Sequence, residues 1–152
     1  MSAYRIVALP GDGTGREVMT EALKVLDVFQ KNGNVEFEIR VIPCGGQHYL
    51  ETGEQWPEGS FEICRDESDA ILLGAIGWPD ARLPNGDVAG GEVILGLRSG
   101  LDLYANVRPV KLYQGVHHKV HGVYKEIWKS SLVDLVMVLS LIHISEPTRR
   151  YS

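Results

Sequence analysis

The chain has 152 residues, of which 44% are hydrophobic and 23% are charged, with a formal net charge of −5 at pH 7 and a sequence pI near 5.5. This length allows one domain with a sizeable core, and the acidic balance disfavours nucleic acid and anionic membranes as main partners. No basic-then-apolar signal region opens the sequence, and its most apolar run, residues 132–144, is too short to cross a bilayer, so we expect a cytoplasmic protein.

The first quarter of the sequence predicts a buried strand and an amphipathic helix. Residues 4–10 form an apolar run that ends in Pro and Gly, which is typical of a strand in a parallel sheet. A helix follows from Arg16 to about Lys31, with capping-box spacing between Thr14 and Glu17, and Gly33 is expected to end it in a left-handed turn. Its apolar face comprises Val18, Ala22, Val25, Leu26 and Phe29.

Strands and helices continue to alternate along the rest of the chain. The expected elements, in order, are a strand over 35–42, one or two short helices over 46–67, a buried strand over 69–76, a polar loop over 77–90, a short helix over 91–98, a strand over 103–112, an irregular segment of loop or edge structure over 113–131 and a core strand over 132–138. This order predicts a doubly wound α/β fold.

Glycines at positions 11, 13 and 15 lie between the first strand and the first helix. Backbone N–H groups and the helix dipole at such a place suit a phosphate or a nicotinamide ring. The spacing matches neither the Rossmann dinucleotide fingerprint nor the P-loop, which needs a lysine before its Ser or Thr. Taken alone, the loop is therefore either a tight structural turn or a cofactor-contacting loop.

Three separate segments carry a resemblance to a known family: ALPGDGTGREVMTEALKVLD, DAILLGAIGWP and GLRSGLDLYANVRPVKLY. In this order and spacing they resemble the isocitrate/isopropylmalate dehydrogenases, the metal-dependent β-decarboxylating dehydrogenases, over roughly residues 4–138. The match is closest to the isopropylmalate branch. The resemblance implies an incomplete isopropylmalate dehydrogenase-like fold, with 1–112 as part of the large domain and 113–138 as the start of a second, dimer-forming domain.

The family oxidises the 2-hydroxyl of a substituted malate by hydride transfer to NAD (NADP is possible) with Mg²⁺ or Mn²⁺, and the β-keto acid then loses carbon dioxide. By resemblance, Arg98 and Arg108 hold the substrate carboxylates, which a guanidinium binds through two parallel hydrogen bonds. The alternative is a pair of surface arginines that form ion pairs with Asp102 or Glu92.

Ile94 and Leu95 occupy the positions where isopropylmalate-type enzymes are apolar and isocitrate enzymes are polar. An apolar pair would leave a third carboxylate unsolvated, so isocitrate is disfavoured as the substrate. The competing interpretation is that both residues belong to the core of a helix.

For the cofactor, the resemblance implicates Gly13, Thr14, Ala75, Gly77 and Glu92. The chain departs from the common pattern at Trp78, where a glycine is frequent. Glu92 itself lies one place from the usual acidic residue. These departures leave NAD versus NADP open.

The family's third carboxylate-binding arginine, its catalytic tyrosine and lysine and its metal-binding aspartates are expected after residue 138, and none follows. Residues 139–149 instead match the translation of a transposase sequencing adapter; the other interpretation is a natural, divergent C-terminus. We therefore expect no catalytic and no metal-binding residue in this chain, a non-native tail over 139–152, and a poorly soluble, inactive polypeptide when it is made alone.

The remaining reactive side chains do not suggest a site of their own. The spacing of Cys44 and Cys64 fits neither a metal site nor a redox motif, so two reduced thiols are expected. The histidines at 117, 118 and 121 are typical of a solvated loop.

The intact protein is thus expected to be a cytoplasmic homodimer that acts on a small dicarboxylate, most simply 3-isopropylmalate in leucine biosynthesis, with no nucleic acid or membrane partner. The alternatives are a tartrate or D-malate dehydrogenase on the same scaffold, a non-catalytic regulatory subunit, and a stand-alone ligand-binding module.

Overall fold

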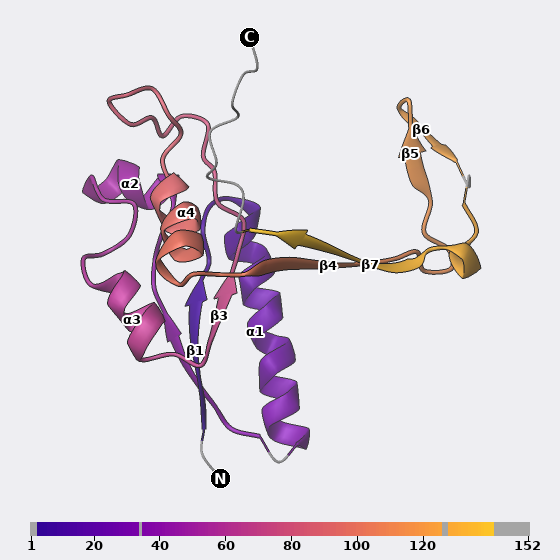
Figure 1. Cartoon of the computed structure of the whole chain (residues 1–152), viewed down its shortest axis with the longest axis horizontal. Coiled ribbons are helices and arrows are strands. Elements are labelled where there is room, and N and C mark those ends of the chain that lie inside the picture. Colours follow the sequence, from indigo (N-terminus) through magenta and orange to yellow (C-terminus); the bar gives the residue numbers. More distant parts are fainter. Residues whose placement is uncertain (1–2, 34, 126–127, 142–152) are drawn as a thin grey trace. The chain divides into compact units, whose positions relative to one another are not determined.

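The computed structural model describes residues 3–33, 35–125 and 128–141 (Figure 1). The chain divides into two compact units, residues 1–101 and 102–152, and each is described by itself. The two units meet at residue 101, whereas the sequence predicts a domain boundary after residue 112. The domain boundary stays a prediction.

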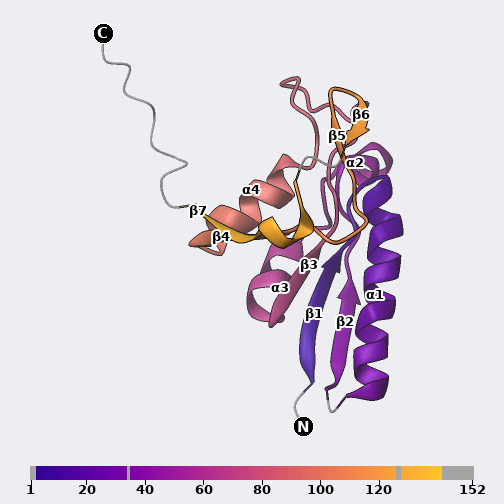
Figure 2. The same ribbon diagram turned by 90° about the vertical axis from the view of Figure 1, so that its right-hand side faces the viewer.

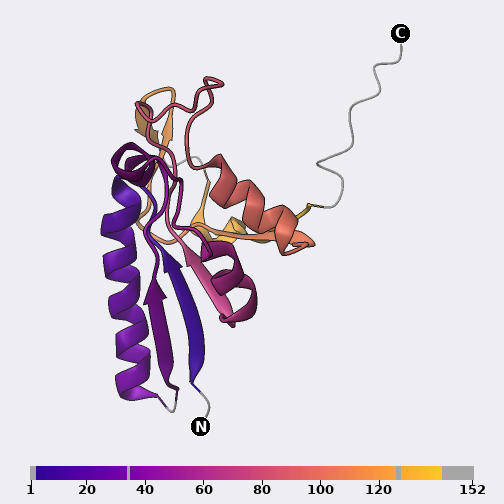
Figure 3. The same cartoon turned by 90° about the vertical axis from the view of Figure 1, so that its left-hand side faces the viewer.

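The first unit is a three-stranded parallel sheet between helices. Figures 2 and 3 show α1 against one face of the sheet and α3 and α4 against the other. None of the helices in the described residues is long and apolar enough to cross a membrane. The strands, in the order β2–β1–β3, and the helices are β1 (Tyr4–Leu9), β2 (Phe37–Val41), β3 (Ala70–Leu73), α1 (Thr14–Asn32), α2 (Gly46–Thr52), α3 (Ser60–Asp66) and α4 (Gly91–Gly100).

The predicted α/β class with a parallel sheet is confirmed. Sequence reasoning located each of these elements to within a few residues, including the break between the two short helices α2 and α3. Each strand reached further in the prediction than in the structure, because apolar residues continue into the turns that follow the strands. The main core holds α3 and α4 onto the sheet and comprises Val7, Leu9, Ile42, Cys44, Trp56, Cys64, Val93 and Leu97.

Three details predicted for α1 are wrong. Its N-cap is Gly13 rather than Thr14, and no side chain caps it. Gly33 ends the helix in an extended conformation (φ −114°), because its N–H reaches back to the Phe29 carbonyl without a left-handed turn. Met19 is buried against the sheet while Val18 is 63% exposed, so the packed face overlaps the predicted one only in the half-buried Ala22 and Leu26.

The second unit contains two separate antiparallel pairs. Its elements are β4 (Ala105–Lys111), β5 (His118–Val120), β6 (Val123–Lys125), the 3-10 helix η1 (Ser130–Leu132) and β7 (Asp134–Ser140). The β5–β6 hairpin lies within residues 113–131, where loop or edge structure was expected, and the irregular pattern did not reveal its two short strands. Its signal is the dipeptide His121-Gly122, since both residues have positive φ (49° and 81°), as a tight two-residue hairpin turn requires.

The predicted core strand at 132–138 is present as β7, but its placement in a core is wrong. Every residue of β7 is exposed, and Val138 retains 64% of its accessible surface. The reason is that, among the residues that the structure describes, β7 pairs only with β4, and a two-stranded ribbon cannot bury either of its faces. The expected non-native tail lies mostly outside the described residues, which end at Leu141.

An ion pair joins the beginnings of β1 and β3. Arg5 donates from NH2 to Asp69 Oδ1 (2.8 Å), and from Nε and its main-chain nitrogen to Oδ2 (3.2 and 2.8 Å). Hydrogen bonding from the Arg5 side chain, chiefly, lowers the pKa of Asp69 from 3.8 to about 2. A lowered pKa means that the ionised carboxylate stabilises the fold above the unfolded-state value, and that this stability is lost as the pH falls through about 2.

We therefore expect Asp69→Asn to lower the free energy of unfolding by a constant amount above about pH 5, and by progressively less toward pH 2. Urea titrations of both proteins across this range provide the measurement. A difference that does not change with pH would contradict the assignment to this ion pair.

Candidate functional site

The loops that follow β1, β2 and β3 gather at the carboxyl end of the sheet (Figures 1 and 2). These loops are residues 10–13, 42–45 and 74–90. In open α/β sheets this is the end at which ligands bind, because the strands deliver their loops and the helix N-termini to one edge.

Asp12 ties these loops together. It is 3% exposed, and its carboxylate accepts three main-chain hydrogen bonds: Oδ2 from Gly46 (2.9 Å) and Gly77 (2.8 Å), and Oδ1 from Gln47 (2.8 Å). Sequence reasoning treated the glycines of this turn and missed its acid. The available signal was a carboxylate inside a glycine-rich turn, where exposed main-chain N–H groups need an acceptor.

Four of the predicted cofactor residues come together through this network. The Asp12 N–H donates to the Ala75 carbonyl (2.7 Å), and the Gly13 N–H donates to Gln47 Oε1 (3.0 Å). Thr14, Ala75 and Gly77 are exposed, and an added Cβ at Gly77 would meet no atom within 4 Å. A flat ring system fits this open glycine-lined surface beside the N-terminus of α1.

Trp78 borders the same surface. Its ring carbon Cζ3 lies 3.4 Å from the position that a Cβ on Gly13 would take, and its Cβ lies 2.8 Å from the one that Gly46 would take. The tryptophan that replaces the expected glycine therefore packs over the turn and leaves no room for a Cβ at Gly46, whereas Gly13 is favoured by its positive φ of 49°.

Helix α4 presents its predicted substrate residues on one side. Ile94 and Arg98 are one turn apart and Leu95 lies between them, while Val93 and Leu97 are buried in the core. Leu95 is 60% exposed, so it is not a core residue of this unit. Arg98 makes no hydrogen bond or ion pair within the described part of its unit; Glu92, one of its suggested partners, is held by Gln55 instead.

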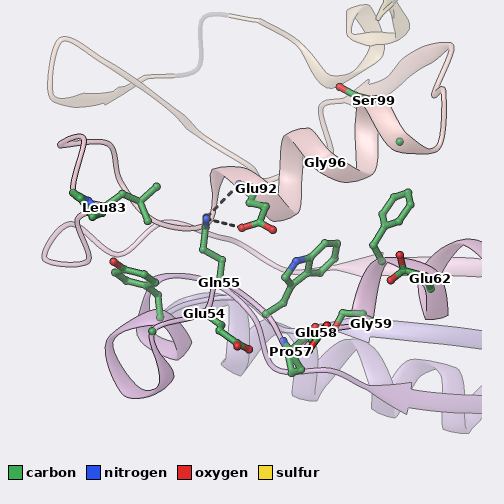
Figure 4. Close-up of a pocket in the computed structure, with 17 residues that line it drawn as sticks. Glu54, Gln55, Pro57, Glu58, Gly59, Glu62, Leu83, Glu92, Gly96 and Ser99 are labelled. Carbon is green, nitrogen blue, oxygen red and sulfur yellow. Dashed lines mark hydrogen bonds between the residues drawn. The ribbon is translucent and has the colours of Figure 1, made fainter.

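Glu92 lies on a different side of α4, together with Gly96 and Ser99, and faces an open cavity of about 910 Å³ (Figure 4). The cavity also carries the carboxylates of Glu54 and Glu58. The negative charges of these glutamates repel a dicarboxylate. This cavity therefore does not suit the substrate, and of the predicted residues of α4 it is lined by Glu92 but not by Ile94, Leu95 or Arg98.

Arg108 belongs to the second unit, on β4, opposite Met137 of β7. With the Asn106 amide turned to satisfy its neighbours, its oxygen accepts from NH2 (3.0 Å) and Nε (3.2 Å) of Arg108. This contact orients the guanidinium from the same side of the strand.

No group of three or more His, Cys, Asp or Glu side chains in the described residues is arranged to hold a metal ion. Cys44 and Cys64 are both buried, and both are free thiols. Burial, above all, raises the pKa of the Cys44 thiol to about 11. Reactive cysteines have depressed pKa values, so Cys44 has a structural rather than a chemical role.

We expect Cys44, measured in a Cys64→Ser variant, to react with an aromatic disulfide reagent at pH 8 at least roughly 100-fold more slowly in the native protein than in urea. A pKa raised from 9.0 to about 11 reduces the thiolate fraction by this factor, and burial adds to it. Native labelling as fast as in urea would contradict the buried position.

Comparisons with known proteins identify the family of this chain. The sequence profile of isocitrate/isopropylmalate dehydrogenases matches residues 5–143. The 3-isopropylmalate dehydrogenase of Clostridium acetobutylicum is 38% identical over 141 residues, which are 93% of this chain and 39% of that protein. The enzyme of the same name from Thermotoga maritima is 43% identical over 140 residues, or 90% of this chain and 38% of that protein. The chain thus spans about two fifths of the length of these relatives.

Solved structures agree in fold. A β-decarboxylating dehydrogenase from Thermococcus kodakarensis is 29% identical with a TM-score of 0.53, covering 90% of this chain and 41% of that chain. Isocitrate dehydrogenase from Methylococcus capsulatus is 24% identical with a TM-score of 0.63, covering 89% and 34%, and this likeness concerns the fold alone. With its glycine turn, its α4 and the profile match over most of its length, the chain belongs to the isocitrate/isopropylmalate dehydrogenase family.

Proposed function

We propose that this chain is the amino-terminal part of an NAD(P)- and divalent-metal-dependent oxidoreductase that oxidises and decarboxylates a 3-substituted malate, with 3-isopropylmalate as the favoured substrate. The observation that carries the proposal is the side of α4 on which Arg98, without a partner in the described part of its unit, lies beside Ile94 and the exposed Leu95. A guanidinium next to an apolar surface suits a malate with a branched alkyl group at C3. The relatives named 3-isopropylmalate dehydrogenase support the same substrate.

Each of these side chains has a distinct task in this proposal. Arg98 binds one substrate carboxylate through two parallel hydrogen bonds, and Arg108, oriented by Asn106, binds a carboxylate in the same way. Leu95 covers the alkyl group and excludes water from it. The third carboxylate of isocitrate would lose its hydration against Leu95 without gaining a partner, which disfavours isocitrate.

The nicotinamide cofactor supplies the hydride acceptor when bound, and Thr14, Ala75 and Gly77 would form its surface at the carboxyl end of the sheet. Mg²⁺ or Mn²⁺, and the residues that hold the metal and move protons, belong to the remainder of the proposed intact enzyme. That enzyme is proposed to act in leucine biosynthesis as a cytoplasmic homodimer, and the 152-residue chain alone is expected to show no turnover.

The test begins with the genomic locus, sequenced beyond the codon for Val138 and expressed as the complete reading frame. Reduction of NAD and NADP is then followed with 3-isopropylmalate, tartrate, D-malate and isocitrate. We expect 3-isopropylmalate to have the highest kcat/KM, and Arg98→Lys to lower it roughly 100-fold because lysine cannot form the bidentate contact. Arg65→Lys, at the end of α3, is the control and should have no kinetic effect.

Other outcomes decide among the alternatives. A higher kcat/KM for tartrate or D-malate would assign those substrates instead. An intact protein that binds dicarboxylates without turnover would be a regulatory subunit, and a natural frame that encodes residues 139–152 and stops would contradict the enzyme altogether. Turnover by the isolated 152-residue chain would show that the remaining segments are not needed.

A further inference from the structure

The N-terminus of α4 lacks a cap of its own. Its N-cap residue is Gly90, with a left-handed φ of 109° and no side chain to accept a hydrogen bond. The first main-chain N–H groups of a helix need an acceptor, which usually comes from the residue at the cap itself. In α4 the acceptor comes from elsewhere in the chain.

Gln55, 35 residues earlier, supplies it (Figure 4). Its Oε1 accepts from the main-chain N–H groups of Gly90 (2.5 Å) and Glu92 (3.2 Å). Its Nε2 donates to Glu92 Oε2 (2.9 Å). One amide therefore uses its oxygen for the first turn of the helix and its nitrogen for the side chain of the same turn.

Gln55 is itself held in place. Its carbonyl oxygen accepts from the Gly45 N–H (2.8 Å), immediately before α2. The next residue, Trp56, is buried in the core at 9% exposure. Gln55 thus connects the beginning of α2 with the beginning of α4, at the edge of the sheet where the cofactor surface lies.

We infer that Gln55 is a positioning residue for substrate binding, acting through α4; this inference rests on the proposed function. Arg98 lies two turns from Gly90 on a ten-residue helix whose buried anchors are Val93 and Leu97. Release of the first turn lets the helix tilt or fray about these anchors, and small displacements of a carboxylate-binding group weaken binding sharply. Gln55 does not touch the substrate in this scheme.

The effect should appear in KM. A carboxylate contact made equally in the ground state and in the transition state affects KM rather than kcat. In the complete enzyme, Gln55→Leu is expected to raise KM for the preferred malate roughly tenfold, with kcat changed less than about twofold. Amide hydrogen exchange at Gly90 and Glu92 should accelerate in the same variant, because their N–H groups lose their acceptor.

A charge swap separates positioning from a general loss of stability. Gln55→Glu places a second carboxylate beside that of Glu92, so the two repel and the first turn is released above the pH at which the pair shares a proton. Adding Glu92→Gln restores an amide–carboxylate pair in the reverse direction, and a carboxylate oxygen at position 55 can still accept from both N–H groups. KM for the malate, measured with saturating dinucleotide, should rise in the single variant, less so at acidic pH, and in the double variant it should return toward the value of Glu92→Gln alone.

The matched control is Gln30→Leu. Gln30 Oε1 also accepts a main-chain N–H, that of Phe37 (2.9 Å), at the opposite end of the unit. This variant should lose stability without any change in KM. Equal KM values for wild type and Gln55→Leu, or no recovery in the double variant, would overturn the inference and leave the proposed function standing. A wild-type enzyme without turnover would refute the proposed function, and the positioning role with it; hydrogen exchange would then still decide whether Gln55 caps α4.

Discussion

Gly11→Ala is expected to destabilise the protein by about 4 kcal/mol. Gly11 has a φ of +75°, which an L side chain rarely adopts. An added Cβ would lie 2.8 Å from the Ala75 carbonyl carbon, nearer still to its oxygen, and 2.9 Å from Ile76 Cγ1. The Ala75 backbone cannot retreat, because its carbonyl also accepts the Asp12 N–H.

Gly53→Ala is the matched control for this prediction. Gly53 ends α2 with a φ of +84°, similar to that of Gly11, but an added Cβ there would meet no atom within 4 Å. It should therefore cost only the backbone strain, about 1 kcal/mol. Urea unfolding of the two variants separates strain from steric conflict, and equal losses would show that the approach of the glycine turn to Ala75 is looser than described.

Asp12→Ala is expected to cost a similar amount, about 4 kcal/mol, because one buried and two part-buried main-chain N–H groups lose their acceptor at once. Asp12→Asn should cost less, about 2 kcal/mol, since its amide oxygen can serve Gly46 and Gly77 while its NH₂ group faces the Gln47 N–H. In the complete enzyme both variants should also weaken NAD(P) binding, because Gly77 is no longer held beside the glycine turn.

Asp27→Asn provides the comparison. Asp27 is an exposed residue of α1 that forms an ion pair with Lys31, one helical turn further on. Loss of this exposed ion pair should cost less than about 1 kcal/mol. Chemical denaturation gives the stabilities, and a fluorescence titration with the dinucleotide gives the affinities. If Asp12→Asn were as mild as Asp27→Asn, the buried carboxylate would not be the connection between the three loops.

Local patterns in the sequence were sufficient for the order of the elements in the first unit. The period of about 3.6 residues in α1 and the apolar runs of β1 and β3 arise from contacts within each element, so they are visible without the fold. The glycine turn and the segments around Arg98 and Arg108 likewise identified the family, because the residue types needed for one reaction occur in a fixed order along the chain.

The same patterns could not show which side of a helix is used. In α4 an apolar residue occurs at Val93, Ile94, Leu95 and Leu97, and only the sheet beneath decides that Val93 and Leu97 are buried while Leu95 faces outward. In α1 the choice of Met19 over Val18 has the same cause. For β7, burial depends on which strands lie beside it, and among the described residues only β4 does.

What the sequence by itself determined is therefore the class of fold, the order of the elements in the first unit and the family. Only the tertiary structure decided that Asp12 gathers three loops and that Gln55 caps a helix 35 residues further on. Hydrogen bonds between distant segments leave no periodic trace in a sequence, because the partners share no spacing and meet only when the sheet brings their loops to one edge.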